Sequence, residues 1–536
     1  VNTIAINAYT TDNKLEPKIY VKDGSEVGEI HTFDDGSVSG DKKLCVSPTS
    51  TGTYTIKEYD ETNSEWIDIK DYVAEYNGTK YESLQEAIDA ASQKNGGQAV
   101  VTMLGNVTIT KTISFVNVSA VSVLLDLNGY TLTGENCRAI QVNKGNLYLE
   151  NGTVTSTDSS DDNKLMNSSV IRIGSDDTTY SGSNPALYMR KGAKVLAPVS
   201  YGVTIFGSAT KGEKLSVENS TIEATGSCPA ISGNGSEKYN TDKSTGWKVM
   251  NVVIQSGAVI SATNNYAIYH PDCGTLSIQG GTISGKGGIQ MCSGTLKISG
   301  SPTITAIGKA EFETGGSGPI YDEAAISVAD RSYPQGPATV SITGTPTITV
   351  EGENGEVIHA FSWDNTTKTE SEWAEAGNYI NVSGGTYSKK FNEAYLAEGC
   401  TLAAKDGMYT VEQTPVAEYN GTQYTSLAQA FTDARNSEAK ATVKLLADVK
   451  VTTSLDISSP QGVTLDLDKK TLTLAGGAQL YTSKTATIKK GTIKRIDEPT
   501  SGNARDFAIY MLDGSSLTLG AGSTLNDTVT LEAKYG

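Results

Sequence analysis

The residues able to do acid–base chemistry are few in this chain of 536 residues. Two of its three histidines stand close to carboxylates in the sequence, His270 beside Asp272 and His359 beside Asp364. A histidine partnered by a carboxylate can transfer protons near neutral pH. No placed serine or cysteine nucleophile accompanies either pair. We therefore expect two surface histidines at corners of the fold, with catalysis as the less favoured alternative.

Three arginines recur at similar places in successive repeats of the sequence, and they define the alternative catalytic groove. Cleavage of a uronic-acid polymer by a lyase needs a basic Arg or Lys beside carboxylates that hold calcium. No matching acidic set accompanies the arginines, and surface arginines lying over apolar side chains explain them more simply. The groove of a polysaccharide lyase or glycoside hydrolase would be formed by Arg138, Arg172, Arg190 and His270.

Aromatic side chains gather in the polar insertion at 359–379, which makes this segment the candidate binding site. Aromatic rings on a rigid scaffold can stack on sugars or anchor a protein partner. The alternative is that the rings fold the insertion down over the neighbouring structure. The candidate binding residues are His359, Phe361, Trp363, Trp373 and Tyr379.

Composition and motifs exclude several other functions. The formal net charge of −18 disfavours nucleic acid and anionic membranes as partners. The chain lacks the long apolar run of a membrane-spanning helix. It also lacks the phosphate loop, HExxH and EF-hand patterns. We therefore expect a monomer with no cofactor, no metal and no catalytic residues.

The six cysteines form no CxxC pair, which argues against a metal ribbon. Cys273 and Cys292 occupy similar positions in adjacent repeats. Stacked strands lie roughly 4.8 Å apart, and disulfides join Cα atoms roughly 4.4–6.8 Å apart, so a bridge is within reach. The simpler reading is that both thiols pack as small apolar groups.

A short repeat organises most of the chain. Ala267-Ile268 returns as Gly288-Ile289, and Thr275–Ile278 returns as Thr295–Ile298. Each unit has two or three short alternating strands separated by turns. One unit cannot bury its own apolar face, whereas stacked units bury a continuous row. The pattern predicts a right-handed parallel β-helix, with polar insertions at its corners at 156–169, 174–185, 232–247, 306–323 and 359–378.

An amphipathic helix is expected to close the start of this β-helix. Ser83 and Glu86 form a capping box, and Leu84, Ala87 and Ile88 lie on one helix face. The same segment returns 343 residues later, where VAEYNGTQYTSLAQAF at 416–431 matches VAEYNGTKYESLQEAI at 73–88. The chain therefore divides into a capped β-helix at 72–414 and the start of a second, truncated module at 415–536.

Residues 1–71 lack the repeat but contain several short alternating stretches. Five or six strands in about 70 residues are typical of a small β-sandwich, with an immunoglobulin-like fold as one form. The overall prediction is an all-β protein in three parts.

Three motifs carry a resemblance to a known group of proteins. The opening EYNGTxYxSLxxA, the strand LDLNGYTLTG and the closing GGTYS…YLAEGCTL…DGMYTV resemble segments of large cell-surface proteins of gut Firmicutes. Those proteins carry tandem right-handed β-helices of the pectate-lyase-like superfamily. The resemblance covers residues 72–536 and implies a secreted protein displayed at the cell surface or wall.

The resemblance does not imply lyase activity, because one fold hosts many functions. Our leading hypothesis is a surface adhesin or display stalk that binds a glycan, or a protein of a host or neighbouring cell, and catalyses nothing. The alternative is a carbohydrate-active enzyme, either a polysaccharide lyase or a glycoside hydrolase.

Overall fold

The computed structural model describes most of the chain from residue 72 onward. The described residues are 44–48, 54–60, 65–68, 72–94, 96–116, 122–159, 168–175, 184–206, 213–233, 249–308, 322–330, 338–363, 368–369, 380–451, 453–475, 477–496, 508–520 and 528–533. Before residue 72 these describe a three-stranded antiparallel sheet of β1 (Leu44–Pro48), β2 (Tyr54–Asp60) and β3 (Glu65–Asp68). The rest of the predicted sandwich at 1–71 lies outside the described residues.

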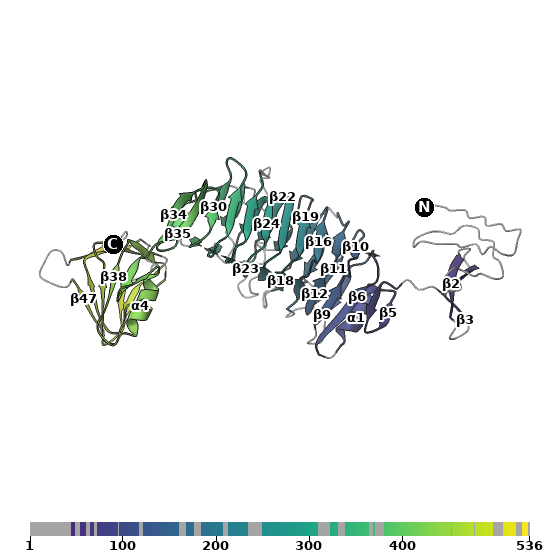
Figure 1. Ribbon diagram of the computed structural model, residues 1–536, viewed down its shortest axis with the longest axis horizontal. Coiled ribbons are helices and arrows are strands. Elements are labelled where there is room, and N and C mark those ends of the chain that lie inside the picture. The colour runs from purple at the N-terminus through teal and green to yellow at the C-terminus, as the bar shows by residue number, and fades with distance from the viewer. Residues whose placement is uncertain are drawn as a thin grey trace.

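The chain is all-β with long sheets of parallel strands, as the sequence predicts. From β6 onward it passes repeatedly through three parallel ladders, which we call faces A, B and C, and we call one passage a coil. We call the coils from β6 to β33 the first stack; its strands follow one another as successive rungs in Figure 1. The arrangement is compatible with a parallel β-helix.

Face A pairs one strand from each coil with the equivalent strand of the next coil. Its members are β6 (Gln98–Met103), β9 (Ser122–Asp126), β12 (Asn146–Glu150), β15 (Ala186–Met189), β18 (Glu213–Val217), β21 (Met250–Ile254), β23 (Thr275–Ile278), β25 (Thr295–Ile298), β28 (Thr339–Ile342) and β32 (Ile380–Val382).

Face B follows face A after a turn of two to four residues in every coil. Its members are β7 (Val107–Ile109), β10 (Thr131–Gly134), β13 (Thr153–Ser156), β16 (Lys194–Ala197), β19 (Thr221–Ala224), the first halves of β22 (Val259–His270) and β24 (Thr282–Met291), β26 (Thr303–Ala306), β29 (Thr347–Val350) and β33 (Thr386–Tyr387).

Face C completes each coil, and the long connections of the first stack all adjoin its strands. These connections precede β14 and β27 and follow β14, β17, β20, β27 and β30. The members of face C are β8 (Ile113–Val116), β11 (Ile140–Lys144), β14 (Ser169–Ile173), β17 (Tyr201–Ile205), β20 (Ile231–Gly233), the second halves of β22 and β24, β27 (Ala324–Asp330) and β30 (Glu356–Trp363). The predicted insertion at 359–378 therefore begins later than expected, because residues 359–363 belong to β30.

Alternation along each strand builds the core of the first stack. Every second side chain points inward and meets the same kind of side chain one rung above and below. On face C this row is formed by Ile140, Ile171, Val203, Ile231, Ile268, Ile289, Ile326 and Ile358, all fully or almost fully buried. The inward rows of the three faces form one continuous apolar core.

Helix α1 (Leu84–Ser92) lies against the first coil, at the start of the stack (Figure 1). The hydroxyl of Ser83 accepts a hydrogen bond from the N–H of Glu86 and caps the helix. Leu84, Ala87 and Ile88 are buried beside β6, β8 and β4 (Ala74–Tyr76), which pairs with β5 (Thr79–Tyr81). The predicted helix and its apolar face are therefore present.

The far end of the first stack carries a hairpin. Strand β35 (Met408–Gln413) pairs with β33 and with β34 (Cys400–Lys405), and a turn at Asp406-Gly407 joins β34 to β35. Phe391 is buried edge-on against Tyr387. A single 3-10 turn, η2 (Glu393–Tyr395), precedes the hairpin.

A second stack with its own apolar core begins after residue 415. It opens with β36 (Ala417–Tyr419), β37 (Thr422–Tyr424) and α4 (Leu427–Arg435). Its three ladders are β38 (Ala441–Leu445), β41 (Val463–Asp466), β44 (Thr485–Lys489), β47 (Ser516–Leu519); β39 (Val449–Val451), β42 (Thr471–Leu474), β45 (Gly491–Arg495), β48 (Val529–Ala533); and β40 (Leu455–Asp456), β43 (Leu480–Thr482), β46 (Ile509–Met511). Among the described residues, no helix has the length and apolar character needed to cross a bilayer.

Candidate functional site

A polar row lines the outer side of face C. Strand pairing places its members in register from the first coil to the ninth: Ser114, Gln141, Arg172, Thr204, Ser232, Tyr269, Gln290, Ser327 and His359. Most of these side chains are buried although they point away from the apolar core. Face C therefore has a second, polar layer outside the apolar one.

Asp322 is the centre of a polar cluster in this layer. Its carboxylate accepts hydrogen bonds from the hydroxyls of Tyr266 and Ser327, the latter at 2.8 Å. Its Oδ2 also lies 2.7 Å from Nδ1 of His359. The Asp322 side chain is 0% exposed, whereas that of His359 is 15% exposed. A buried carboxylate is costly unless it is fully partnered, and three coils supply these partners.

Tyr266 reaches Asp322 because a glycine faces it on the next rung. Tyr266 pairs with Gly287, and a Cβ atom at Gly287 would overlap the Tyr266 ring. Burial, followed by the nearby Asp322 charge, raises the pKa of Tyr266 well above its ordinary value. Tyr266 therefore remains a neutral hydrogen-bond donor to Asp322 at physiological pH.

His359 is the member of the cluster with the most access to solvent. Asp322 holds one ring nitrogen, and the ring stacks on Phe361 with centroids 4.8 Å apart. An imidazole held by these two contacts has a set orientation. The arrangement is chemically able to transfer a proton or to bind an anionic or hydroxylated group. Gln290 extends the network by donating to Ser327 at 3.3 Å.

Two of the predicted arginines lie near the same outer layer, several coils away from His359. Arg138 donates to Gln141 at 2.6 Å and to Ser169 at 3.1 Å. The Arg172 guanidinium lies 4.3 Å from the centre of the Phe206 ring, a cation–π contact.

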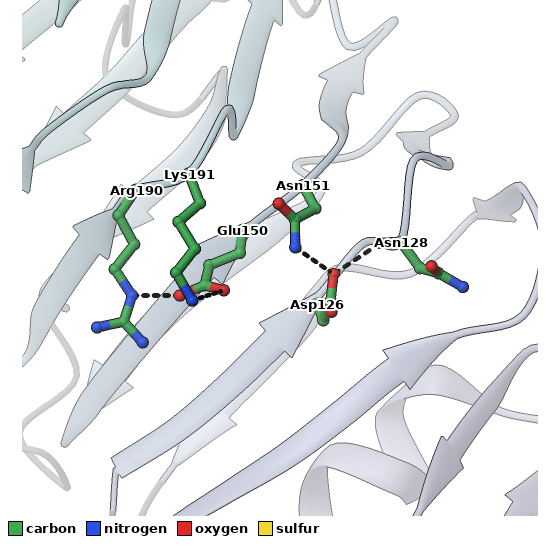
Figure 2. Close-up of polar contacts among 6 residues, drawn as sticks. All are labelled: Asp126, Asn128, Glu150, Asn151, Arg190 and Lys191. Atoms are coloured by element: carbon green, nitrogen blue, oxygen red, sulfur yellow. Dashed lines mark hydrogen bonds and ion pairs between the residues drawn. The ribbon is translucent and has the colours of Figure 1, made fainter. Parts of the chain in front are cut away.

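Arg190 lies in another part of the first stack, beyond the end of β15 on face A. Its guanidinium pairs with Glu150, and Lys191 pairs with the other carboxylate oxygen at 3.0 Å (Figure 2). The neighbouring rung shows the same kind of contact, with Asp126 accepting from Asn151 at 3.1 Å. This cluster ties successive turns together, and it does not share a groove with Arg172.

Tyr148 and Tyr188 flank this cluster on the outer side of face A. Their rings stack with centroids 4.5 Å apart, and Arg190 covers the Tyr148 ring. Lys214 lies over Tyr188. Because these contacts occupy the ring faces, the pair is a column of packed side chains rather than a platform for a sugar.

His270 points into the apolar interior, which corrects the expectation of a surface histidine at this position. Its side chain is 0% exposed. It belongs to an inward row of face C, between Gly233 on the preceding rung and Met291 on the next rung. Burial lowers the pKa of its imidazole to about 4, despite nearby backbone groups that act in the opposite direction. A neutral histidine inside the wall cannot take part in an outer catalytic groove with the arginines.

Cys273 and Cys292 are not joined by a disulfide in the structure, which corrects the bridged alternative. His270 pairs with a residue 21 positions later, whereas Thr275 pairs with a residue 20 positions later. The register therefore shifts in the turn between them, and the two cysteines in this turn do not lie opposite each other. Burial, and then the charge of Asp272, raises the pKa of Cys273 to about 11. Both observations favour packed thiols.

The structure describes the side chains of two of the five candidate binding residues, His359 and Phe361. His359 contacts Asp322 and stacks on Phe361. Phe361 packs with Tyr269 and Cys292 in a small apolar cluster outside the main core. Trp363 ends β30, but its side chain lies outside the described residues, as do Trp373 and Tyr379 entirely. The described residues contain no group of three or more His, Cys, Asp or Glu side chains placed to hold a metal ion.

Sequence reasoning missed the central residue of this site. Asp322 lies a few residues before Ala325-Ile326, which match the repeated Ala267-Ile268 pair. An acidic residue just before that repeated pair is the signal that could have identified it. Its partners lie 56, 5 and 37 positions away, so only the stacking of coils brings them together.

Comparison of the chain with protein-family models, with curated proteins and with solved structures found no match.

Proposed function

We propose that this chain is part of an extracellular surface protein, an adhesin or display stalk that binds a glycan or a protein of another cell. In this proposal the parallel ladders form a right-handed parallel β-helix, α1 is its N-terminal cap, and a second β-helix module begins at 415. A small β-sandwich at 1–71 precedes them. The protein is monomeric and is secreted to the cell surface or wall. Its formal net charge of −18 disfavours nucleic acid as a ligand.

The distribution of connections on the first stack carries this proposal. Turns from face A to face B have two to four residues in every coil, whereas every long connection adjoins face C. A rigid ladder that places all of its variable segments along one side is suited to presenting a single recognition surface. A glycan is the favoured ligand because the row ends at His359, a partly exposed imidazole held by Asp322 that can hydrogen-bond a hydroxyl group.

A binding panel tests this proposal. The full chain is incubated with immobilised pectins, mucin glycans and uronic-acid polymers, and retention and released products are measured together. We expect retention without products, weakened by Trp363→Ala and by replacing residues 234–248 with a Gly-Ser linker. Lys297→Ala, an exposed change on face A, is the control. Retention on mucin after its glycans are removed would indicate a protein ligand, and no retention on any surface would contradict the proposal.

A carbohydrate-active enzyme is the second candidate, and one observation favours it. Asp322 orients His359 as an acid–base residue would be oriented, with the imidazole at the edge of the buried cluster. Release of unsaturated or reducing-end products in the same panel, abolished by His359→Ala and by Asp322→Asn but retained by Lys297→Ala, would replace the binding proposal with this one.

A further inference from the structure

The junction between the two stacks contains an ionisable group that contacts both. Glu398 lies between η2 and β34 at the end of the first stack. Its Oε1 accepts a 3.0 Å hydrogen bond from the backbone N–H of Leu427, the first residue of α4 in the second stack. The first N–H groups of a helix have no partner within the helix. Glu398 therefore supplies from one stack an acceptor that the helix of the other stack needs.

A cavity surrounds this contact and is lined by both stacks. It has a volume of ≈ 400 Å³. Glu398 and Cys400 line it from the first stack, and Ser426, Lys450 and Ser454 line it from the second. Its presence means that the two stacks are not tightly packed around the carboxyl group. Glu398 is half-buried beside this cavity, so a small rearrangement of the junction would expose its carboxyl group fully to water.

The equivalent helix in the first stack is held by neutral groups instead. Gln85 donates to the carbonyl of Ser114 at 3.0 Å and accepts from the Ser114 N–H at 2.8 Å. The matching position in the second copy, 343 residues later, is Ala428, which lines the cavity. The second copy therefore lacks the pair of hydrogen bonds that Gln85 makes in the first copy. Instead, the carboxyl group of Glu398, from the first stack, contacts its helix.

We propose that the junction between the two stacks is a proton-controlled hinge, closed when Glu398 is protonated and loosened when Glu398 is ionised.

The balance of forces on Glu398 supports this direction. Burial raises the pKa of Glu398 to about 7, although the hydrogen bond from Leu427 acts to lower it. Lys450 on β39 faces the same cavity, and its positive charge also favours the ionised form. Cys400 on β34 stays neutral because burial, and then Glu398, raises its pKa. Beside the cavity, Asp456 is neutralised by Arg435 at 2.6 Å. The burial cost therefore dominates.

Linkage gives the pH window. An open junction returns Glu398 to water and to its ordinary pKa of 4.5. Because the closed state has the higher pKa, it is fully favoured below about 4.5. The closed-to-open ratio then falls about tenfold per pH unit until the closed-state pKa near 7 is reached, and it is constant above that value.

Hydrogen exchange tests the hinge, because it measures small populations of an open state. The full chain is exchanged at several pH values from 4 to 8, with rates corrected for intrinsic exchange, and peptides covering α4 are compared with peptides covering α1. We expect protection at the start of α4 to fall with rising pH up to about 7, while protection at α1 stays constant.

Two variants make the test specific. Glu398→Gln keeps an acceptor for Leu427 but cannot ionise, so protection at α4 should become independent of pH. Glu412→Gln, at an exposed position on β35, removes the same charge and should retain the wild-type response. Circular dichroism confirms that each variant is folded. Constant α4 protection in the wild type, or the same slope in Glu398→Gln, would overturn the hinge without bearing on ligand binding at face C.

Discussion

Asp322 and His359, 37 positions apart, meet at 2.7 Å on the outer side of face C. Stacking of β27 beneath β30 places them there, and Tyr266 from β22 completes the cluster. The pair combines a fully buried carboxylate with an imidazole at the edge of solvent.

His359→Ala should lower the free energy of unfolding more than Asp322→Asn, which removes the charge that His359 partners. His359→Ala leaves the buried Asp322 carboxylate without its cationic or N–H partner, which costs roughly 3–5 kcal/mol for a broken buried pair. Adding Asp322→Asn should recover part of this loss, because the buried charge is gone. Chemical denaturation of the two single variants and the double variant measures the coupling. Purely additive losses would show that the two side chains do not interact.

Gly287→Ala should disturb the same cluster from the neighbouring rung. The added methyl group overlaps the Tyr266 ring and forces it away from Asp322. We expect a loss of about 1–3 kcal/mol in the free energy of unfolding. Gly105→Ala is the matched control, because a Cβ atom there meets nothing within 4 Å. Equal effects of the two substitutions on the denaturation midpoint would argue against the steric explanation.

His270 should make stability depend on pH in the acid range. The folded-state pKa of about 4 lies below the value of 6.5 expected when unfolded. Stability is therefore complete above pH 6.5 and is lost as the pH falls toward 4, by about 3 kcal/mol in total. His270→Met, which matches Met291 on the next rung, should remove this component. The difference between the unfolding curves of wild type and variant over this range isolates it, and parallel curves would contradict the prediction.

Reducing agent should leave the melting temperature nearly unchanged. Cys273 and Cys292 are thiols buried or half-buried in the wall, and the apolar rows supply most of the burial. Alkylation after unfolding without reductant should label both cysteines, as read by mass spectrometry. A fall of many degrees in Tm with Cys273→Ser, together with unlabelled cysteines, would show that a bridge forms in solution.

The sequence by itself determined the repeated strands and the two amphipathic helices. Alternation in segments such as Thr275–Ile278 specifies which side chains point inward, and the return of that pattern requires stacking, since one unit alone cannot bury its apolar face. Ser83 and Ser426 cap helices in the two copies, as local sequence chemistry predicts. These features depend on neighbours in the chain or on exact repetition.

Only the tertiary structure decided where the polar residues meet. The lengths of the connections set which residues share a rung, and those lengths vary along face C, so the partners of Asp322 and the inward direction of His270 cannot be counted from the repeat alone. The arginines show the same limit, since similar places in the repeat put Arg172 on face C and Arg190 beyond face A. Glu398 contacts α4 only because a second stack begins beside it. Its raised pKa comes from burial at that junction, which the residue type alone does not reveal.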